Sequence, residues 1–114
     1  MGDWTREIEH EERIYPPIHP GEMLREEWLE ELGMNANQLA KALGVPRQSV
    51  YEIVNERRGL SAEMALRLAR WSGMSPHFWL GLQERYELET AEWLEGEKIE
   101  SEVTPLEPFP TGRT

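Results

Sequence analysis

Apolar side chains recur at helical spacing along most of this 114-residue chain, and no segment alternates apolar and polar residues as a half-buried strand would. Pro20 suits the first turn of a helix, and Leu24, Trp28 and Leu32 follow it at four-residue intervals. The pattern predicts a first helix from Pro20 to about Leu32, ended by Gly33.

Two shorter helices are expected next. Asn35 can cap the second helix, which ends before Gly44, and Pro46 opens the third. The second helix carries a narrow apolar stripe of Leu39, Ala40 and Leu43. The third is expected to bury Val50, Ile53 and Val54.

The remaining pattern predicts two more helices. Ser61 begins a fourth helix that ends at Gly73, and Ser75-Pro76 repeats the cap-plus-proline start for a fifth. The fifth helix is expected to reach about Leu94 and to stop at Gly96. Its apolar positions at helical spacing are Phe78, Trp79, Leu82, Tyr86 and Trp93.

These elements divide the chain into an acidic N-terminal arm (1–18), an all-α domain of five helices (19–95) and a proline-rich tail (96–114). The arm is expected to be mobile, and the tail, which has three prolines and no apolar period, to be disordered. The fifth helix is longer than a five-helix core requires, so its far half is expected to form a dimer contact. The apolar residues there are Leu88, Trp93 and Leu94.

The net charge of −10 at first argues against binding to nucleic acid, but the charge is unevenly distributed. Residues 1–32 carry three Arg against ten Asp and Glu (net −7), residues 33–74 six Lys and Arg against three Glu (+3), and residues 75–114 three against nine (−6). The basic middle predicts a surface for a polyanion. The acidic ends either face a basic partner or only aid solubility.

Residues 36–55 have the spacing of a helix-turn-helix. Ala40 is small where two helices must cross steeply, and Gly44, four residues later, allows the left-handed backbone of a tight turn. Val50 and Ile53 follow six and nine residues after that glycine and are placed to pack the second helix onto the first. Such a unit lays the N-terminal residues of its second helix in the major groove of DNA.

Eight polar residues are placed to contact DNA, each with an ordinary solvated role as its alternative. Arg47 and Gln48 begin the second helix of this unit, the recognition helix, where Arg can pair with guanine and Gln with adenine. Tyr51 can reach a phosphate or a thymine methyl, while Glu52 either accepts from cytosine or orients Arg47. The residues assigned to backbone phosphates are Gln38, Ser49, Arg57 and Arg58.

From Pro17 to about Glu92 the chain resembles the HigA-type (VapI-like) antitoxins of the Xre-like helix-turn-helix class. The stretches that carry the resemblance are HPGEMLREEWLEELGM, NQLAKALGVPRQSVYEIVNERRGLSAEMALRLARW and GMSPHFWLGLQERYELETAE. The resemblance implies a five-helix lambda-repressor-like fold and a homodimer that represses its own operon. It also implies neutralisation of a small basic toxin similar to RelE-type mRNA-cleaving endoribonucleases.

A homodimer is expected to place two recognition helices in successive major grooves of a double-stranded operator, about 34–36 Å apart. An RNA-cleaving toxin must be basic where it grips RNA, so an acidic surface is expected to face it. One candidate is the arm, with Glu7, Glu9, Glu11 and Glu12. The other is the first helix, with Glu26, Glu27, Glu30 and Glu31.

Two other functions stay open. A stand-alone helix-turn-helix regulator without a toxin would keep every DNA-facing residue, whereas a protein-binding adaptor gives no reason for the cluster of arginines. No nucleophile elbow, phosphate loop or histidine triad is visible, and His10, His19 and His77 lack metal-ligand spacing, so a non-enzyme without cofactor or metal is predicted. The absence of cysteine, of a bilayer-length apolar run and of a signal peptide predicts a cytoplasmic protein.

Overall fold

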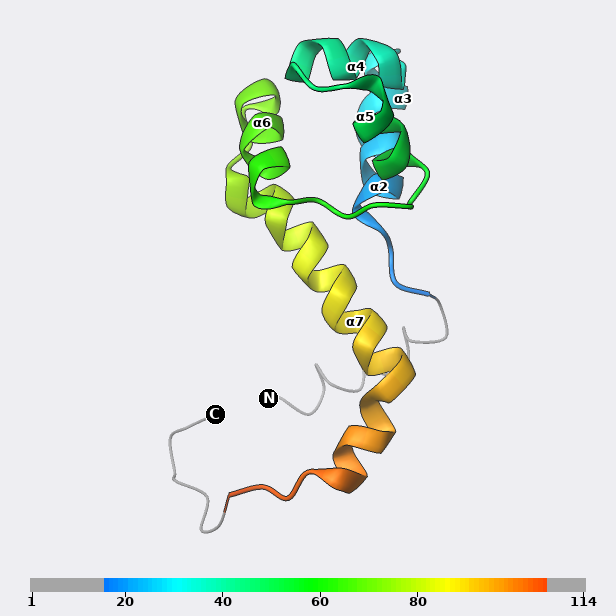
Figure 1. The fold of residues 1–114 in the computed structure, drawn as a ribbon, viewed down its shortest axis with the longest axis vertical. Coiled ribbons are helices and arrows are strands. Elements are labelled where there is room, and N and C mark those ends of the chain that lie inside the picture. The colour runs from blue at the N-terminus through cyan, green and yellow to red at the C-terminus, as the bar shows by residue number, and fades with distance from the viewer. Residues whose placement is uncertain (1–15, 107–114) are drawn as a thin grey trace.

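A computed structural model describes residues 16–106, in which every regular element is a helix (Figure 1). The first helix consists of three consecutive segments: α2 (Pro20–Met23), η1 (Leu24–Leu29), which has the wider π-type hydrogen bonding, and α3 (Glu30–Leu32). It is followed by α4 (Ala36–Leu43), α5 (Arg47–Val54), α6 (Ala62–Ser72) and α7 (Pro76–Glu102). The expected all-α fold of five helices is confirmed. None of the described helices combines the length and apolar character needed to cross a bilayer.

The helices begin and end at the residues that local chemistry predicts. The Asn35 side chain accepts from the backbone N–H of Gln38 at 2.8 Å, and the Gln38 side chain accepts from the N–H of Asn35 at 2.9 Å, which completes a capping box. Ser61 and Ser75 cap α6 and α7 through their hydroxyls. The glycines that end the first helix, α4 and α6 have φ of +66°, +71° and +83°, at Gly33, Gly44 and Gly73.

The core contains the apolar faces that the sequence pattern identifies. Trp79 is fully buried, and its indole N–H donates to the Ser72 hydroxyl at 2.9 Å, so its polar group keeps a partner. Trp28 packs between Trp79 and Trp71, with ring centroids 5.2 and 5.8 Å away. Trp79 is thus a core residue, while Trp28 and Trp71 are partly buried and pack against the core.

His19 caps the first helix and is itself buried at its start. Its Nδ1 accepts from the backbone N–H of Gly21 at 2.8 Å, and its ring meets the ring of Tyr86 edge-on at a centroid distance of 4.8 Å. Burial lowers the pKa of His19, although the charges of Glu56 and Glu22 act to raise it. The imidazole is therefore held in the neutral form that can accept the capping hydrogen bond.

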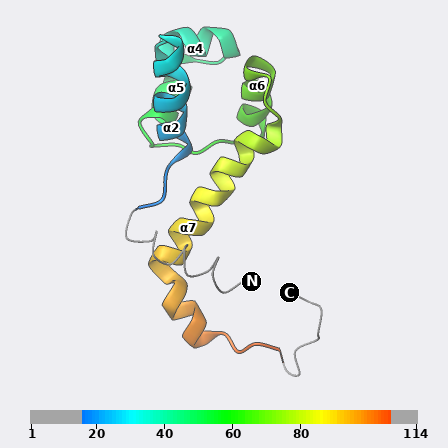
Figure 2. The same ribbon diagram turned by 180° about the vertical axis from the view of Figure 1, so that it is seen from behind.

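The last helix is longer than the sequence analysis predicts. Gly96 does not stop it: α7 runs through Gly96 to Glu102, so the first part of the expected tail is helical. A glycine ends a helix where the chain must turn left-handed, and inside a helix it costs only about 1 kcal/mol relative to Ala. Figures 1 and 2 show the far half of α7 extending away from the other helices. Residues 1–15 of the expected arm and 107–114 of the expected tail lie outside the described residues.

Candidate nucleic-acid interface

Helices α4 and α5 form the bent pair that the spacing predicts. Gly44 turns the chain with φ +71°, and the N–H of Val45 donates back to the carbonyl of Ala40 at 3.1 Å. Ala40, Val50 and Ile53 are all nearly inaccessible to solvent at the packed centre of the pair. The predicted helix-turn-helix is confirmed.

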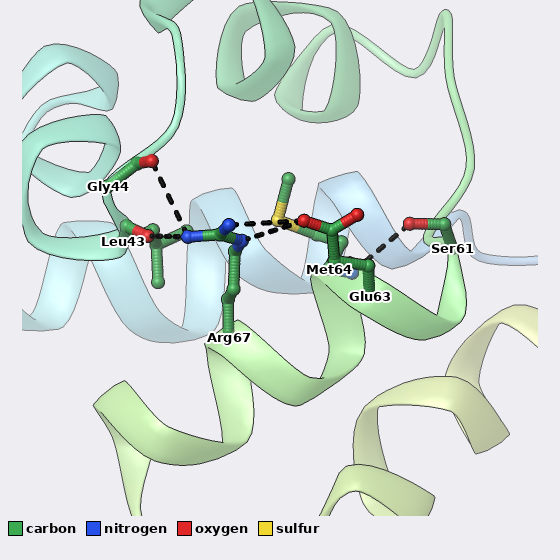
Figure 3. A network of polar contacts seen from close by, with 6 residues as sticks. All are labelled: Leu43, Gly44, Ser61, Glu63, Met64 and Arg67. Atoms are coloured by element: carbon green, nitrogen blue, oxygen red, sulfur yellow. Dashed lines mark hydrogen bonds and ion pairs between the residues drawn. The ribbon is translucent and has the colours of Figure 1, made fainter.

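Arg67 of α6 hydrogen-bonds to the backbone at the turn between α4 and α5 (Figure 3). Its Nη1 donates to the carbonyl oxygen of Leu43 at 2.8 Å and to that of Gly44 at 3.4 Å, while its Nη2 pairs with Glu63 at 3.1 Å. The last carbonyls of a helix have no partner within the helix, so this arginine caps α4. Sequence reasoning assigned no role to Arg67, because only its four-residue spacing from Glu63 was visible.

Arg25 caps the end of the recognition helix α5 in the same way. Its Nη1 donates to the carbonyl oxygen of Val54, and its Nη2 lies 3.5 Å from a carboxylate oxygen of Glu56. Glu56 follows α5 in the left-handed conformation, with φ +62°. Two basic residues of the chain are thus engaged in positioning the motif, and neither was identified from the sequence.

The first turns of α5 present the predicted base readers to solvent. Arg47 and Gln48 are exposed, and Ser49 is half-buried beside them. The guanidinium carbon of Arg47 lies 5.8 Å from the ring centroid of Tyr51, one turn later, which is within cation–π range. Arg47 and Tyr51 therefore stand together as one exposed unit on α5.

Glu52 does not orient Arg47, which was one of its two predicted roles. Its Oε2 accepts from Nε2 of Gln48 at 3.1 Å, and its Oε1 lies 2.7 Å from Nη2 of Arg58. The hydrogen bond from Gln48, with a smaller contribution from Arg58, lowers the pKa of Glu52 against the opposing effect of burial. An ionised Glu52 consequently joins the recognition helix to the loop that follows it.

The other predicted phosphate contacts lie at the two ends of the motif. Gln38 is exposed at the start of α4, where its carbonyl oxygen serves the capping box and its amide N–H groups remain available to donate. Arg57 and Arg58 are exposed shortly after α5, and of these two only Arg58 forms an ion pair within residues 16–106, with Glu52. In residues 16–106 no three histidine or carboxylate side chains come together as metal ligands would.

The chain is similar to known helix-turn-helix proteins. Residues 26–70 match the family model described as helix-turn-helix. The chain is 51% identical over 77 residues to virulence-associated protein I of Dichelobacter nodosus, a match that covers 68% of this chain and 71% of that protein.

Solved structures are also similar to this chain in both sequence and fold. An addiction module antidote protein of the HigA family from Coxiella burnetii is 49% identical with a TM-score of 0.77, covering 81% of this chain and 100% of its own. The Pseudomonas aeruginosa antitoxin HigA, solved with the higBA promoter, is 49% identical with a TM-score of 0.76, covering 79% of this chain and 98% of its own.

Proposed function

This chain belongs to the HigA-type family of helix-turn-helix proteins, and we propose that it is a DNA-binding antitoxin that represses its own operon as a homodimer. The observation that carries the proposal is the helix-turn-helix held by Arg25 and Arg67, with Arg47 and Gln48 exposed at the head of its second helix. The relative that was solved with its promoter supports it. The family is one of DNA-binding regulators, and no enzymatic activity is proposed.

The proposal divides the exposed residues into base readers and phosphate contacts. Arg47 pairs with the acceptor edge of guanine, and Gln48 pairs with adenine through its amide. Tyr51 extends the contact to a phosphate or a thymine methyl. The residues proposed to contact the DNA backbone are Gln38, Ser49, Arg57 and Arg58.

The homodimer is proposed to form through the far half of α7. Leu88 and Leu94 are 65% and 69% exposed in the protomer, and Trp93 is 41% exposed beside them. Beyond Gly96 the helix adds Ile99, which is also half-exposed. Leu88 and Ile99 lie about three turns apart on one side of the helix, whereas Trp93 and Leu94 face other directions, so a second copy packed along one side would bury only some of these side chains. Their burial would still supply apolar area of the kind that protein interfaces favour.

A cytoplasmic, basic, RelE-like mRNA-cleaving toxin is the proposed protein partner. The exposed carboxylates of Glu26, Glu27, Glu30 and Glu31 on the first helix provide an acidic face that suits it. Among the described residues, only Glu26 of these four is in an ion pair, with Arg25. The acidic arm is the other candidate surface, and most of it lies outside the described residues.

Fluorescence anisotropy with the duplex upstream of the protein's own reading frame tests the DNA-binding function. A scrambled duplex of the same composition is the control, and both are titrated at several salt concentrations. We expect the promoter duplex to bind at least about a thousandfold more tightly than the scrambled one. Equal affinity for both duplexes would exclude an operator-specific repressor, and no salt-dependent binding to either would favour the protein-binding adaptor.

Co-expression with the adjacent reading frame separates an antitoxin from a stand-alone regulator. An antitoxin should co-purify with the product of that frame and relieve its growth inhibition. If the neighbouring product is neither bound nor toxic, promoter binding would remain and the stand-alone regulator would be the better description.

A further inference from the structure

Gln48 and Glu52 form a hydrogen-bonded pair one turn apart on α5, and the chemistry of the pair fixes which way the amide of Gln48 faces. Nε2 of Gln48 donates to Oε2 of Glu52 at 3.1 Å. An ionised carboxylate can only accept hydrogen bonds, so the amide must turn its NH₂ group toward Glu52 and its carbonyl oxygen away. Rotation of the amide by 180° would bring two acceptors together.

The pair leaves Gln48 with one free N–H and one free carbonyl oxygen. In the major groove adenine presents the N7 acceptor beside the N6 amino donor, which matches that remaining pair. Guanine presents two neighbouring acceptors, N7 and O6, and a glutamine with one N–H already engaged can satisfy only one of them well. The preformed pair therefore suits adenine and disfavours guanine.

Arg58 keeps Glu52 in the state that this selection needs. Its Nη2 lies 2.7 Å from Oε1 of Glu52, the carboxylate oxygen that Gln48 does not use. The guanidinium favours the ionised carboxylate and offsets its negative charge, which would otherwise repel nearby phosphates. Glu52 can thus remain beside Gln48 while the helix lies against DNA.

We propose that Glu52 is a specificity-determining residue, which positions Gln48 to accept adenine and to reject guanine at one base pair of each half-site. The inference rests on the proposed DNA-binding function and gives Glu52 a part that needs no contact with a base. It replaces the orientation of Arg47 as the role of this carboxylate.

The test is selection from a duplex library with a randomised core, followed by affinity measurements on single-base variants of the selected sequence. The wild-type protein is compared with Glu52→Ala, Glu52→Gln and Glu56→Gln. Glu56→Gln is the charge-matched control, because Glu56 follows the same helix but pairs with Arg25. Gln48→Ala identifies the base pair that Gln48 contacts.

At that base pair the wild type should prefer adenine over guanine by about tenfold or more. Glu52→Ala should reduce the preference by about threefold or more while leaving the other base pairs unchanged, because a free Gln48 amide can also present two N–H groups to guanine. Glu52→Gln should keep the preference, since its amide oxygen can still accept from Gln48, and should bind all duplexes more tightly because a negative charge is lost. Glu56→Gln should keep the preference as well.

Two results would overturn the inference while the proposed function stands. One is a Glu52→Ala profile that matches the wild type at the Gln48 base pair. The other is loss of selectivity for cytosine at a different base pair, which would make Glu52 a direct base reader. A wild type that selects no sequence at all from the library would instead refute the proposed function.

Discussion

A Cβ atom added to Gly21 would lie 1.7 Å from the carbonyl oxygen of Ile53. The first helix and the recognition helix therefore approach backbone to backbone at this point, and only a residue without a side chain permits it. Because Ile53 lies in α5, this contact helps to set the angle at which α5 is presented to DNA.

Replacing Gly21 with Ala should lower the free energy of unfolding by about 3 kcal/mol, because the two backbones must separate to admit a methyl group. Urea unfolding followed by circular dichroism measures the change. Gly81→Ala is the matched control: nothing lies within 4 Å of its added Cβ, so it should stabilise α7 by about 0.5–1 kcal/mol. Equal stability of Gly21→Ala and the wild type would show that the close approach is not required.

Replacing Arg67 with Met should destabilise the fold by about 1–2 kcal/mol, since the carbonyls that end α4 lose a charged donor. The length of the side chain is kept, so packing changes little. Arg85→Met on α7 removes an exposed i,i+4 ion pair with Glu89 and should cost less than about 0.5 kcal/mol. Thermal unfolding of both variants measures the change in Tm. Equal losses of Tm in the two variants would contradict the role of Arg67 as a cap.

Arg47→Ala and Arg57→Ala should affect DNA binding in different ways. Loss of Arg47 should cost about 1–3 kcal/mol on the operator and relax selectivity at one base pair. Loss of Arg57 should weaken binding to all duplexes alike and reduce the salt slope by about one, as expected for a phosphate contact. Titrations on operator and random duplexes measure both effects. Identical behaviour of the two variants would disprove the division into base reader and phosphate contact.

Charged residues on the far half of α7 should break the homodimer. Leu88→Glu combined with Leu94→Glu should give a monomer in sedimentation velocity at micromolar concentration, with operator affinity reduced because two half-sites are no longer bound together. Leu66→Glu places the same charge on an exposed leucine of α6 and should leave the dimer intact. A wild-type protein that sediments as a monomer with and without DNA would refute the interface.

Acid should destabilise the protein through His19. Its pKa is lowered in the folded state, so below its ordinary value of 6.5 the unfolded chain takes up a proton that the folded chain does not. Stability from this residue is complete above pH 6.5 and is lost as the pH falls through the lowered pKa. Urea unfolding at a series of pH values should show this loss in the wild type. The loss should be smaller in His19→Asn, whose amide oxygen can still cap the helix. Parallel curves for the two proteins would exclude His19 as the cause.

Local features of the sequence were enough to place the helices. Asn35, Ser61 and Ser75 cap α4, α6 and α7, and Gly44 turns the chain where the spacing to Val50 and Ile53 requires it. These signals work because a cap, a left-handed turn or an apolar stripe depends on residues within a few positions of one another. The helix-turn-helix and its exposed leading residues follow from them.

Tertiary structure alone decided how that motif is held and which partners its polar residues take. Gly21, Arg25 and Arg67 contact carbonyls 23 to 32 positions away in the chain, a separation that no local pattern reports. The sequence left two roles open for Glu52, contact with cytosine or with Arg47, and the path of the loop after the helix brought Arg58 to it instead. Gly96 remained helical because nothing in the fold required the chain to turn there. The chemistry of a residue limits the contacts that it can make. The tertiary structure decides which of these contacts form, because it brings distant parts of the backbone close to that residue.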